Sequence, residues 1–353
     1  MKPVIALTTG DPSGIGPEIC LKAAALPRVL QSCRPLLVGD QAHLLETART
    51  IPGLPDPSGW PEVSRPAFAE IGSKQGAEGE VEGWADGPAF HDMADLEPLP
   101  EIPGPSAAGG RAAVKYIKQA VGLVRFGSAA AIVTAPISKT ALRLAGVPYP
   151  GHTELLADLC GAELEEVAML FVAPDLKVAL LSVHESLRDA IALLSRERVA
   201  ARLALLRAEH RRWFGAEPRI GLCALNPHAG EEGMFGKEEQ EILAPAAEAA
   251  RASGCDVRGP LPADTLFARA ARGEFDLVLA LHHDQGTIAV KSRAFGGAVN
   301  MTLGLPLLRT SVDHGTAYDI AGKGIADPSS LAEAILLATR LAPRARAAHP
   351  QRP

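Results

Sequence analysis

Short apolar runs alternate with helical stretches along most of this 353-residue chain. The runs PVIALTT, PLLVGD, AAAIVTAP and FDLVLAL are each followed by a polar turn and then by a segment with helical periodicity. Repeated alternation of this kind is typical of parallel sheets flanked by helices. We therefore expect an α/β fold, and the length, which exceeds what one hydrophobic core usually supports, predicts two domains.

Composition and charge exclude several classes of partner. The net charge is −6 and the chain has no long basic tract, which argues against nucleic acid binding. No apolar stretch approaches the length of a membrane span. The five cysteines are scattered without CxxC spacing, which is typical of a reducing compartment. The chain begins with a strand that runs straight into a glycine-rich turn, leaving no room for a signal peptide, so we expect a cytoplasmic protein.

Three histidines follow three separate apolar runs. KVALLSVH ends at His184, IGLCALNPH at His228 and FDLVLALHH at His283, with Asp284 beside the last. Ligands of open α/β sheets bind outside the carboxyl ends of the strands, where three imidazoles and a carboxylate make a divalent metal site. The structural alternative is that each histidine is bonded to a backbone carbonyl at its own strand end.

The first apolar run leads into the turn TTGDPSGIGPEI, which precedes a helix starting at Pro17. Such a turn presents backbone N–H groups to an anion, or simply needs glycine for its backbone conformation. The spacing is not GxGxxG and no acidic residue is placed to hold a ribose, so a Rossmann fold is not predicted.

Further candidate residues lie near predicted strand ends. Lys139 follows a strand, and His152 and Thr153 precede the helix ELLADL, where Thr153 suits the N-cap position. Asp264 is explained as the N-cap of a helix or, alternatively, as a carboxylate facing the metal. Beyond His283 come the substrate-binding candidates Lys291, Asn300 and Arg309, among apolar residues expected to form strands; two cations around an amide suit a carboxylate or phosphate.

Two stretches have weaker patterns. From about residue 51 to 104 the chain is rich in proline, glycine and acidic residues, and FAEIG and GPAF are its strand-like pieces. We expect a surface insertion or a pair of edge strands there. The last helix is predicted over 330–341, followed by a frayed tail, PRARAAHPQRP.

These segments together resemble a known family. GDPSGIGPEI, GHTELLA, LNPHAGEEGMFGKEE, GPLPADTLF, HHDQG and VNMTLGLPLLRTSVDHGTAYDIAG resemble, in order, the 4-hydroxythreonine-4-phosphate dehydrogenases of pyridoxal phosphate biosynthesis. DHGTAYDIAGKGIADP is also similar to a loop of isopropylmalate and isocitrate dehydrogenases. Both families are metal-dependent oxidative decarboxylases that bind NAD(P) without a Rossmann fold, which agrees with the missing GxGxxG.

The resemblance implies two α/β/α domains with the active site in a cleft between them. A discontinuous cofactor-side domain would comprise residues 1–140 and 295–353, and a central domain, 141–294, would carry the metal and the dimer interface. The family's zinc, magnesium, manganese or cobalt ion would be held by His184, His228 and His283, in a homodimer whose interface completes the site. Substrate contacts would come from His152, Thr153, Lys291, Asn300 and Arg309, and NAD or NADP would bind at His314, Gly315, Thr316, Asp319 and Ala321.

The implied reaction is NAD(P)-dependent oxidation of 4-(phosphooxy)-threonine, followed by decarboxylation to 3-amino-2-oxopropyl phosphate. Asp284, Asp264 and Lys139 are candidates for the base that takes the hydroxyl proton. Family members usually carry tyrosine where this chain has His282 and often proline at Ala289, which leaves the substrate open. The alternatives are a related dehydrogenase of another small hydroxy-acid, such as a 4-phosphothreonate-like sugar acid or a ring dihydrodiol, and a non-catalytic relative.

Overall fold

The computed structural model describes the chain except for residues 1, 64–83, 85, 295 and 349–353, and it has two compact units. We call residues 1–164 with 305–353 the terminal unit and residues 165–304 the central unit. This grouping places its divisions later in the chain than the predicted domain boundaries at 140 and 294. The roles assigned to those domains stay predictions.

The terminal unit contains a parallel sheet in the order β3-β2-β1-β4-β11. Its strands are β1 (Val4–Thr8), β2 (Arg34–Gly39), β3 (Ala89–Asp92), β4 (Ala131–Thr134) and β11 (Arg309–Ser311). All residues of β2 and β4 are buried, which explains why these strands are continuous apolar runs rather than alternating patterns. The α/β fold predicted from the alternation is confirmed.

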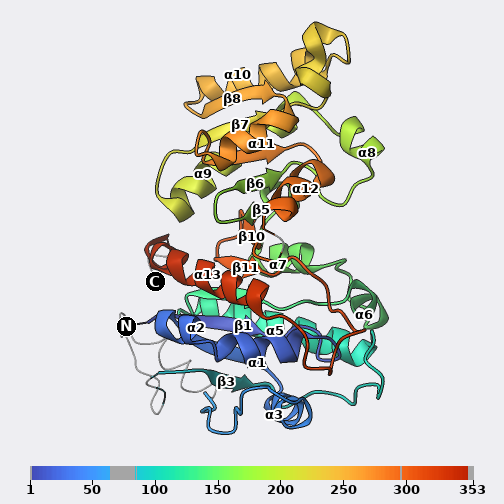
Figure 1. Cartoon of the computed structure of the whole chain (residues 1–353), viewed down its shortest axis with the longest axis vertical. Helices are drawn as coiled ribbons and strands as arrows, with labels where there is room; N and C mark the ends of the chain where they lie inside the picture. Colours follow the sequence, from blue (N-terminus) through green and yellow to red (C-terminus); the bar gives the residue numbers. More distant parts are fainter. Residues whose placement is uncertain (1, 64–83, 85, 295, 349–353) are drawn as a thin grey trace. The chain divides into compact units, whose positions relative to one another are not determined.

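Helices cover both faces of this sheet. On one face α1 (Gly16–Ala24), α2 (Pro27–Ser32) and α13 (Ser329–Ala348) contact one another, and α5 (Ala107–Arg125) packs on β1, β2 and β4 (Figure 1). The crossover from β1 to β2, which contains α1, and the crossover from β3 to β4, which contains α5, run in opposite directions along the sheet, so right-handed connections place the two helices on opposite faces. The remaining helices are α3 (Gln41–Thr50), α6 (Lys139–Leu144) and α7 (His152–Cys160).

The central unit contains a mixed sheet in the order β10-β5-β6-β9-β7-β8. Its strands are β5 (Ala168–Val172), β6 (Lys177–Leu180), β7 (Arg219–Cys223), β8 (Asp256–Leu261), β9 (Leu277–Ala280) and β10 (Val299–Leu303). Strand β5 runs antiparallel to both β6 and β10, a departure from the expected parallel sheet. The connection from β5 to β6 is too short for a crossover helix, so these strands form a hairpin.

The helices of the central unit also lie on two faces. Helix α9 (Arg196–Phe214) packs with α10 (Ala244–Ala252), whereas α11 (Ala263–Ala271) and α12 (His283–Arg293) contact β9. Shorter elements are α8 (Leu187–Ala192), the turn η2 (Pro227–Gly233) and the π-helical segment η3 (Glu239–Leu243), and η1 (Leu164–Glu166) lies where the two units divide.

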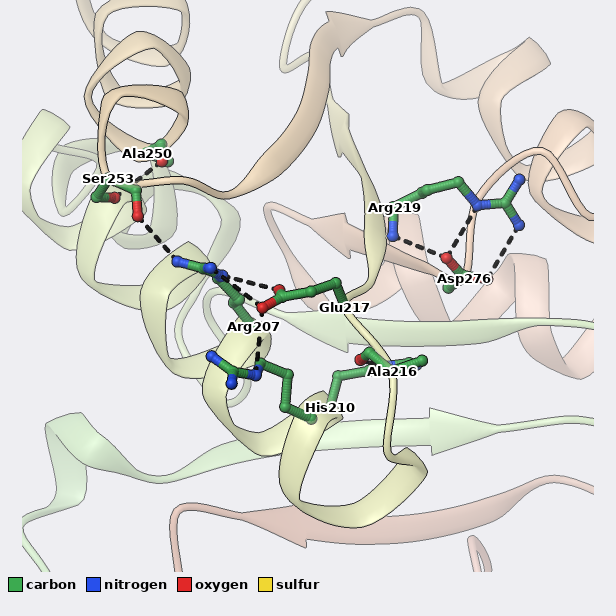
Figure 2. Close-up of polar contacts among 9 residues, drawn as sticks. Arg207, His210, Ala216, Glu217, Arg219, Ala250, Ser253 and Asp276 are labelled. Carbon is green, nitrogen blue, oxygen red and sulfur yellow. Dashed lines mark hydrogen bonds and ion pairs between the residues drawn. The ribbon is translucent and has the colours of Figure 1, made fainter.

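A polar network fixes the amino ends of β7 and β9. Asp276 accepts hydrogen bonds from the backbone N–H of Arg219 at 2.7 Å and from its guanidinium at 3.0 Å (Figure 2). Arg207 on α9 donates to Glu217 and to the backbone oxygen of Ser253, and His210 contacts the Ala216 carbonyl at 3.0 Å. Because this network lies at the amino ends of the strands, it holds their register at the edge opposite the predicted metal histidines.

Several local predictions need correction. Helix α7 begins at His152 after an extended Gly151, itself a good N-cap residue, so Thr153 lies in the first turn rather than at the cap. Helix α11 begins at Ala263 with Pro262 in the N-cap position, so Asp264 lies in the first turn and is not its N-cap. The stretch around Lys291 is helical rather than a strand, because His282 Nδ1 accepts from Gln285 N while Gln285 Oε1 accepts from Leu281 N.

The ends of two other regions also differ from expectation. GPAF contributes to β3, which forms the edge of the terminal sheet, whereas FAEIG lies outside the described residues. The last helix continues to Ala348 instead of ending at 341, so the part of the tail up to that residue is helical. Ala342 and Ala345 are buried, which explains why the helix extends through Pro343.

Gly10 fixes the turn after β1, and its replacement is a test of the fold. Its φ is +70°, and a Cβ atom there would lie 2.3 Å from the Pro136 carbonyl oxygen. We expect Gly10→Ala to lower the free energy of unfolding by about 3 kcal/mol or more, from left-handed strain plus the backbone clash. Gly53→Ala is the matched control, with φ +80° and open space around its Cβ, and should cost about 1 kcal/mol in urea unfolding. Equal losses of unfolding free energy in the two variants would show that the clash with the Pro136 carbonyl does not occur.

Candidate active site

The three predicted metal histidines follow three neighbouring strands of the central sheet. Strands β6, β9 and β7 are adjacent and parallel, with Leu180 opposite Ala280 and Leu222 opposite Leu279. His184, His283 and His228 come after the carboxyl ends of these strands, in that spatial order. The topology therefore brings all three to the same edge of one sheet, as expected from the sequence.

The imidazoles do not form a coordination shell in the single chain. Among the described residues, no group of three or more His, Cys, Asp or Glu side chains is placed to hold a metal ion. His184, His228 and His283 are all exposed. His283 Nδ1 lies 2.7 Å from Asp284 Oδ1, an orientation that leaves its Nε2 pointing away from the carboxylate and available to a ligand.

His228 lies in a turn with an unusual backbone conformation. His228, Ala229, Glu231 and Glu232 all have φ between 43° and 57°, a left-handed conformation that costs about 1 kcal/mol or more per non-glycine residue. The buried Glu239 holds the start of the turn, because its Oε1 accepts from the backbone N–H groups of Leu225 and Asn226 at 2.8 and 2.7 Å. Strain maintained in this way is typical of functional sites.

Three other predicted residues belong to the central unit. Asn300 lies on β10, and its Oδ1 is buried without a hydrogen-bond partner among the described residues. A buried acceptor without a partner costs free energy, which a bound ligand would recover. Lys291 is exposed on α12 and Asp264 is exposed in the first turn of α11. Within the described part of the chain, neither side chain makes a contact that bears on its predicted role.

Arg309 and His152 lie near one another in the terminal unit, where Arg309 is buried and His152 is half-buried. Arg309 is only 2 % exposed on β11, and its Nη2 donates to Thr134 Oγ1 at 2.7 Å. Burial lowers the pKa of Arg309 to about 9. Burial and the nearby Arg309 cation also hold the pKa of His152 well below its usual range, although a hydrogen bond with the Ala135 backbone opposes the shift. His152 is therefore neutral at neutral pH.

The His152 ring has an unsatisfied atom. Its Nε2 is buried without a hydrogen-bond partner in the described part of the chain. Because the other ring nitrogen bonds to the Ala135 backbone, Nε2 of the neutral ring is an acceptor that suits a ligand hydroxyl, whereas the nearby Arg309 cation suits an anionic group. Thr153 follows in the first turn of α7, where the helix N-terminus favours negative charge, and Lys139 begins α6 after its N-cap Ser138.

The predicted cofactor loop contacts the first glycine-rich turn. Ile15 N donates to the Thr316 carbonyl at 2.9 Å, and a Cβ atom on Gly14 would lie 2.8 Å from the same oxygen. Ala321 joins residues of the turn in lining a cavity of about 560 Å³, which α3 and residues 96–103 complete. His314 Nδ1 lies 3.1 Å from the Gly315 oxygen, and Asp319 is exposed.

Asp11 and Tyr318 join these two segments but were not among the predicted site residues. Tyr318 OH donates to Asp11 Oδ2 at 2.6 Å, and Ser13 N donates to Asp11 Oδ1 at 3.0 Å. Burial raises the pKa of Asp11, while the Tyr318 and Ser13 hydrogen bonds oppose this shift. Asp11 belongs to the motif GDPSG and Tyr318 to the motif HGTAYD. Nothing in the sequence shows that these two residues contact each other.

Replacing Tyr318 by phenylalanine should destabilise the fold in a pH-dependent way. Because burial raises the folded pKa of Asp11, its contribution to stability is greatest below the unfolded pKa and declines as pH rises through the folded value. Loss of the Tyr318 donor raises the folded pKa further. We expect Tyr318→Phe to cost about 1–2 kcal/mol above neutral pH and less near pH 4, by urea unfolding.

The control for this variant is Tyr149→Phe, which removes an exposed hydrogen bond of 2.5 Å to Asp158 Oδ2. Exposed pairs contribute little, so its loss should be within about 0.5 kcal/mol at either pH. A pH-independent loss in Tyr318→Phe would show that the hydroxyl does not stabilise the ionised Asp11.

A buried arginine beside a neutral histidine, and imidazoles at strand ends of an α/β unit, are groups that enzymes acting on small anionic substrates use. Among the described residues, no helix has the length and apolarity needed to cross a bilayer. The sequence model of the family described as "Pyridoxal phosphate biosynthetic protein PdxA" matches residues 31–338. The chain belongs to this family, and it is a dehydrogenase.

Named relatives cover almost the whole chain. It is 46% identical over 346 residues to a D-threonate 4-phosphate dehydrogenase of Cupriavidus necator, covering 97% of this chain and 98% of the relative. It is 44% identical over 351 residues to a 4-hydroxythreonine-4-phosphate dehydrogenase of Geobacter metallireducens, covering 97% and 96%. A crystal structure of 4-hydroxythreonine-4-phosphate dehydrogenase from Klebsiella pneumoniae superposes with a TM-score of 0.81 at 38% identity, covering 97% of this chain and 100% of that one. The resemblance inferred from the motifs is confirmed.

Proposed function

We propose that this protein oxidises a four-carbon hydroxy-acid that carries a terminal phosphate, with NAD(P) as hydride acceptor. The first candidate substrate is 4-(phosphooxy)-threonine, whose oxidised product loses carbon dioxide to give 3-amino-2-oxopropyl phosphate. The second is D-threonate 4-phosphate, which is favoured by the 46% identity to a dehydrogenase of that name. The observation that carries the proposal is the buried Arg309 beside the half-buried His152.

This pair suits the anionic end of such a substrate. A guanidinium binds a phosphate or carboxylate through two parallel hydrogen bonds, and these are strong where water is excluded. His152 Nε2 supplies an acceptor for a substrate hydroxyl, and Thr153 at the start of α7 adds a hydroxyl beside the positive end of the helix. Lys291 and Asn300 of the central unit are proposed to contact the rest of the substrate, and the partnerless Asn300 Oδ1 supports this role.

We propose that His184, His228 and His283 hold a divalent cation in the assembled enzyme. Imidazoles after three adjacent strands and an Asp284 carboxylate oriented on His283 are a donor set that fits zinc, cobalt or manganese, and magnesium with added oxygen ligands. Such an ion, when bound, supplies a Lewis acid for the oxygen of the reacting alcohol. The strained turn at His228 would keep that ring fixed for this role.

A homodimer is the assembly that the exposed surface of the central unit supports. Leu187, Ile191 and Leu193 follow His184, and Met234 and Phe235 follow His228; all five are 40 to 74% exposed. Apolar side chains beside predicted ligands are typical of a surface covered by a partner. We propose that this surface is covered by a second subunit, whose residues complete the site.

The proton of the reacting hydroxyl needs an acceptor, and three groups remain candidates. Asp284 is adjacent to His283 and bonded to its ring, Asp264 lies at the start of α11, and Lys139 at the start of α6. Asp284 has the closest link to the proposed metal site, although orienting His283 is an equally direct use of its carboxylate.

A substrate panel tests the proposed function. Purified protein would be mixed with NAD⁺ or NADP⁺, a divalent ion, and either 4-(phosphooxy)-L-threonine, D-threonate 4-phosphate or their unphosphorylated forms. We expect reduced cofactor and released carbon dioxide with one phosphorylated compound, and at least about a hundredfold lower kcat/KM without the phosphate. Equal rates with and without phosphate, or no turnover of either phosphorylated compound, would reject the proposal.

A further inference from the structure

Three polar side chains connect the strand ends that precede the predicted metal histidines. Ser182 follows β6, Gln285 lies in the first turn of α12 after β9, and Glu239 begins η3, beyond the turn that follows β7. Each of them bonds to backbone atoms of these strand ends, and Ser182 and Glu239 are buried. None of the three is itself a predicted ligand.

The first connection joins the ends of β6 and β9. Regular pairing of these two strands ends at Ala280. Beyond it, Ser182 Oγ donates to the Leu281 carbonyl oxygen at 3.0 Å. Each of these two residues stands two positions before a predicted ligand, which is His184 in one segment and His283 in the other. The hydroxyl therefore holds the two ligand segments together past the point where the sheet does so.

Gln285 makes the second connection, between the ends of β9 and β7. Its Oε1 accepts from Leu281 N at 2.8 Å, and its Nε2 donates to the Ala224 carbonyl oxygen at 2.8 Å. Regular pairing of β7 with β9 ends at Leu222, so this amide also continues the link past the last paired residues. A glutamine amide donates through its nitrogen and accepts through its oxygen, and one side chain can thus bridge two backbone segments.

Glu239 makes the third connection, to the turn that carries His228. Besides accepting from the backbone N–H groups of Leu225 and Asn226 through Oε1, it accepts from Asn226 Nδ2 through Oε2 at 2.9 Å. Gly230 lies against the same carboxylate, because a Cβ atom there would lie 2.8 Å from Oε2. The carboxylate therefore contacts the chain on both sides of His228.

A simpler explanation is that the three side chains only satisfy backbone groups, which need partners at strand ends in any fold. Two observations favour a role at the predicted metal site. The connections run without a break from β6 to β9, to β7 and to the His228 turn, which is the spatial order of the predicted ligands. The turn at the end of this series has a left-handed backbone, a conformation that persists only where surrounding contacts maintain it.

We propose that Ser182, Gln285 and Glu239 are positioning residues that set the spacing of the three predicted ligand segments and thereby the affinity for the divalent cation. None of them is proposed to touch the ion or the substrate. Ligands that are already held in place lose less conformational freedom when the ion binds, so loosening a connection weakens binding. The inference rests on the proposed three-histidine site and adds to it the residues that support that site.

Titration of the metal-free, full-length protein with Zn²⁺ or Co²⁺ tests this without any substrate. Gln285→Met keeps the length of the side chain but loses both hydrogen bonds, and should weaken metal binding about 10–100-fold. Glu239→Gln places an amide N–H opposite Asn226 Nδ2, so that two donors face each other, and should weaken binding about tenfold. Ser182→Ala should have a smaller effect, because Leu281 keeps its bond to Gln285.

Each of the two main variants has a matched control. Glu209 is a buried carboxylate of the same unit that accepts from the backbone N–H of Gly304 at 3.0 Å, so Glu209→Gln controls for Glu239→Gln. Gln119 is a half-buried glutamine of the terminal unit that also makes a side-chain hydrogen bond, so Gln119→Met controls for Gln285→Met. Both controls should bind metal as tightly as the unmodified protein, whatever their effect on stability.

A double variant tests whether the connections act together. Gln285 and Glu239 hold the same segment, at Ala224 and at Leu225 with Asn226. Once one of them is lost, the segment has less order left to lose, so the combined loss of affinity should be smaller than the product of the two single losses. The visible spectrum of bound Co²⁺ should also change in both single variants, because it depends on the arrangement of the ligands.

The outcomes separate this inference from the proposed oxidation. Weaker metal binding in Gln285→Met and Glu239→Gln, with unchanged controls, supports it even if no hydroxy-acid of the panel is oxidised. Lower stability with unchanged metal affinity would show that the connections serve the fold alone and would overturn it. Equal losses in the controls, a double variant that loses the full product, or no metal binding by the unmodified protein would also overturn it. Turnover of a phosphorylated substrate by protein that binds no metal would do so while leaving the proposed oxidation in place.

Discussion

Replacement of Arg309 by methionine is expected to lower kcat/KM about a thousandfold without destabilising the protein. The side chain is buried on β11 beside His152, so its removal takes away the cation that the proposed substrate anion would meet. Burying a charge is itself costly, and a methionine of similar length fills the space with apolar atoms. The unfolding midpoint should therefore stay equal or rise while activity is lost.

The pKa of His152 provides a second measurement on the same variant. Because the Arg309 cation helps to lower it, Arg309→Met should raise the pKa of His152 toward its ordinary value, as followed by NMR of the ring protons. Arg309→Lys keeps the charge but loses the planar guanidinium and its paired N–H donors. Its activity should lie between that of the unmodified protein and that of Arg309→Met.

Arg34→Met is the matched control for the buried arginine. Arg34 is also buried on a strand of the terminal sheet, where its guanidinium lies 4.1 Å from the Trp84 ring and bonds to the Trp84 carbonyl. Its loss should reduce stability and leave kcat/KM near the original value, the reverse of the Arg309 result. Full activity in Arg309→Met would remove the substrate-anion role.

Alanine at His228 or His283 should abolish metal retention and lower activity by about a thousandfold or more. Each substitution removes one of three proposed imidazole ligands, and a site with two ligands holds its ion far more weakly. Metal content after dialysis, measured by elemental mass spectrometry, reports this loss independently of turnover. Asp284→Asn keeps all three ligands and should weaken metal binding by about 10–100-fold.

His210→Gln serves as the control. His210 is buried in the same unit, and its ring bonds to the backbone oxygen of Ala216, away from the predicted metal histidines. Its metal content should match that of the unmodified protein. If His228→Ala retained a full complement of metal together with normal activity, the three-histidine site would have to be abandoned.

The sequence predicts the sheet scaffold well because the relevant signals are local. Buried parallel strands such as β4 appear as continuous apolar runs, and the strand-end positions of His184, His228 and His283 follow from those runs. The helix N-caps were less predictable. Thr153 and Asp264 are residue types that suit an N-cap, but a nearby glycine in one helix and a nearby proline in the other occupy that position. The antiparallel β5 depends on the short connection to β6, and apolar periodicity does not distinguish strand direction.

Parts of the candidate site could not be predicted because they depend on residues far apart in the chain. Tyr318 meets Asp11 across 307 positions, and Glu239 reaches back to Leu225 and Asn226 to hold a left-handed turn. The low pKa of His152 arises from burial and from the Arg309 cation, and local sequence predicts neither. The motifs contain these residues, whereas their contacts require the folded sheet.

The contact between Tyr318 and Asp11 has a consequence for the order in which the two units can fold during synthesis. The central unit is one continuous stretch of chain, so every residue it needs has been synthesised by residue 304. The terminal unit instead waits for β11, the loop that carries Tyr318, and α13, which are made last. The glycine-rich turn is thus among the first segments to emerge and among the last to acquire its partners. A product truncated after residue 304 would contain the whole central unit but lack the contacts that hold this turn.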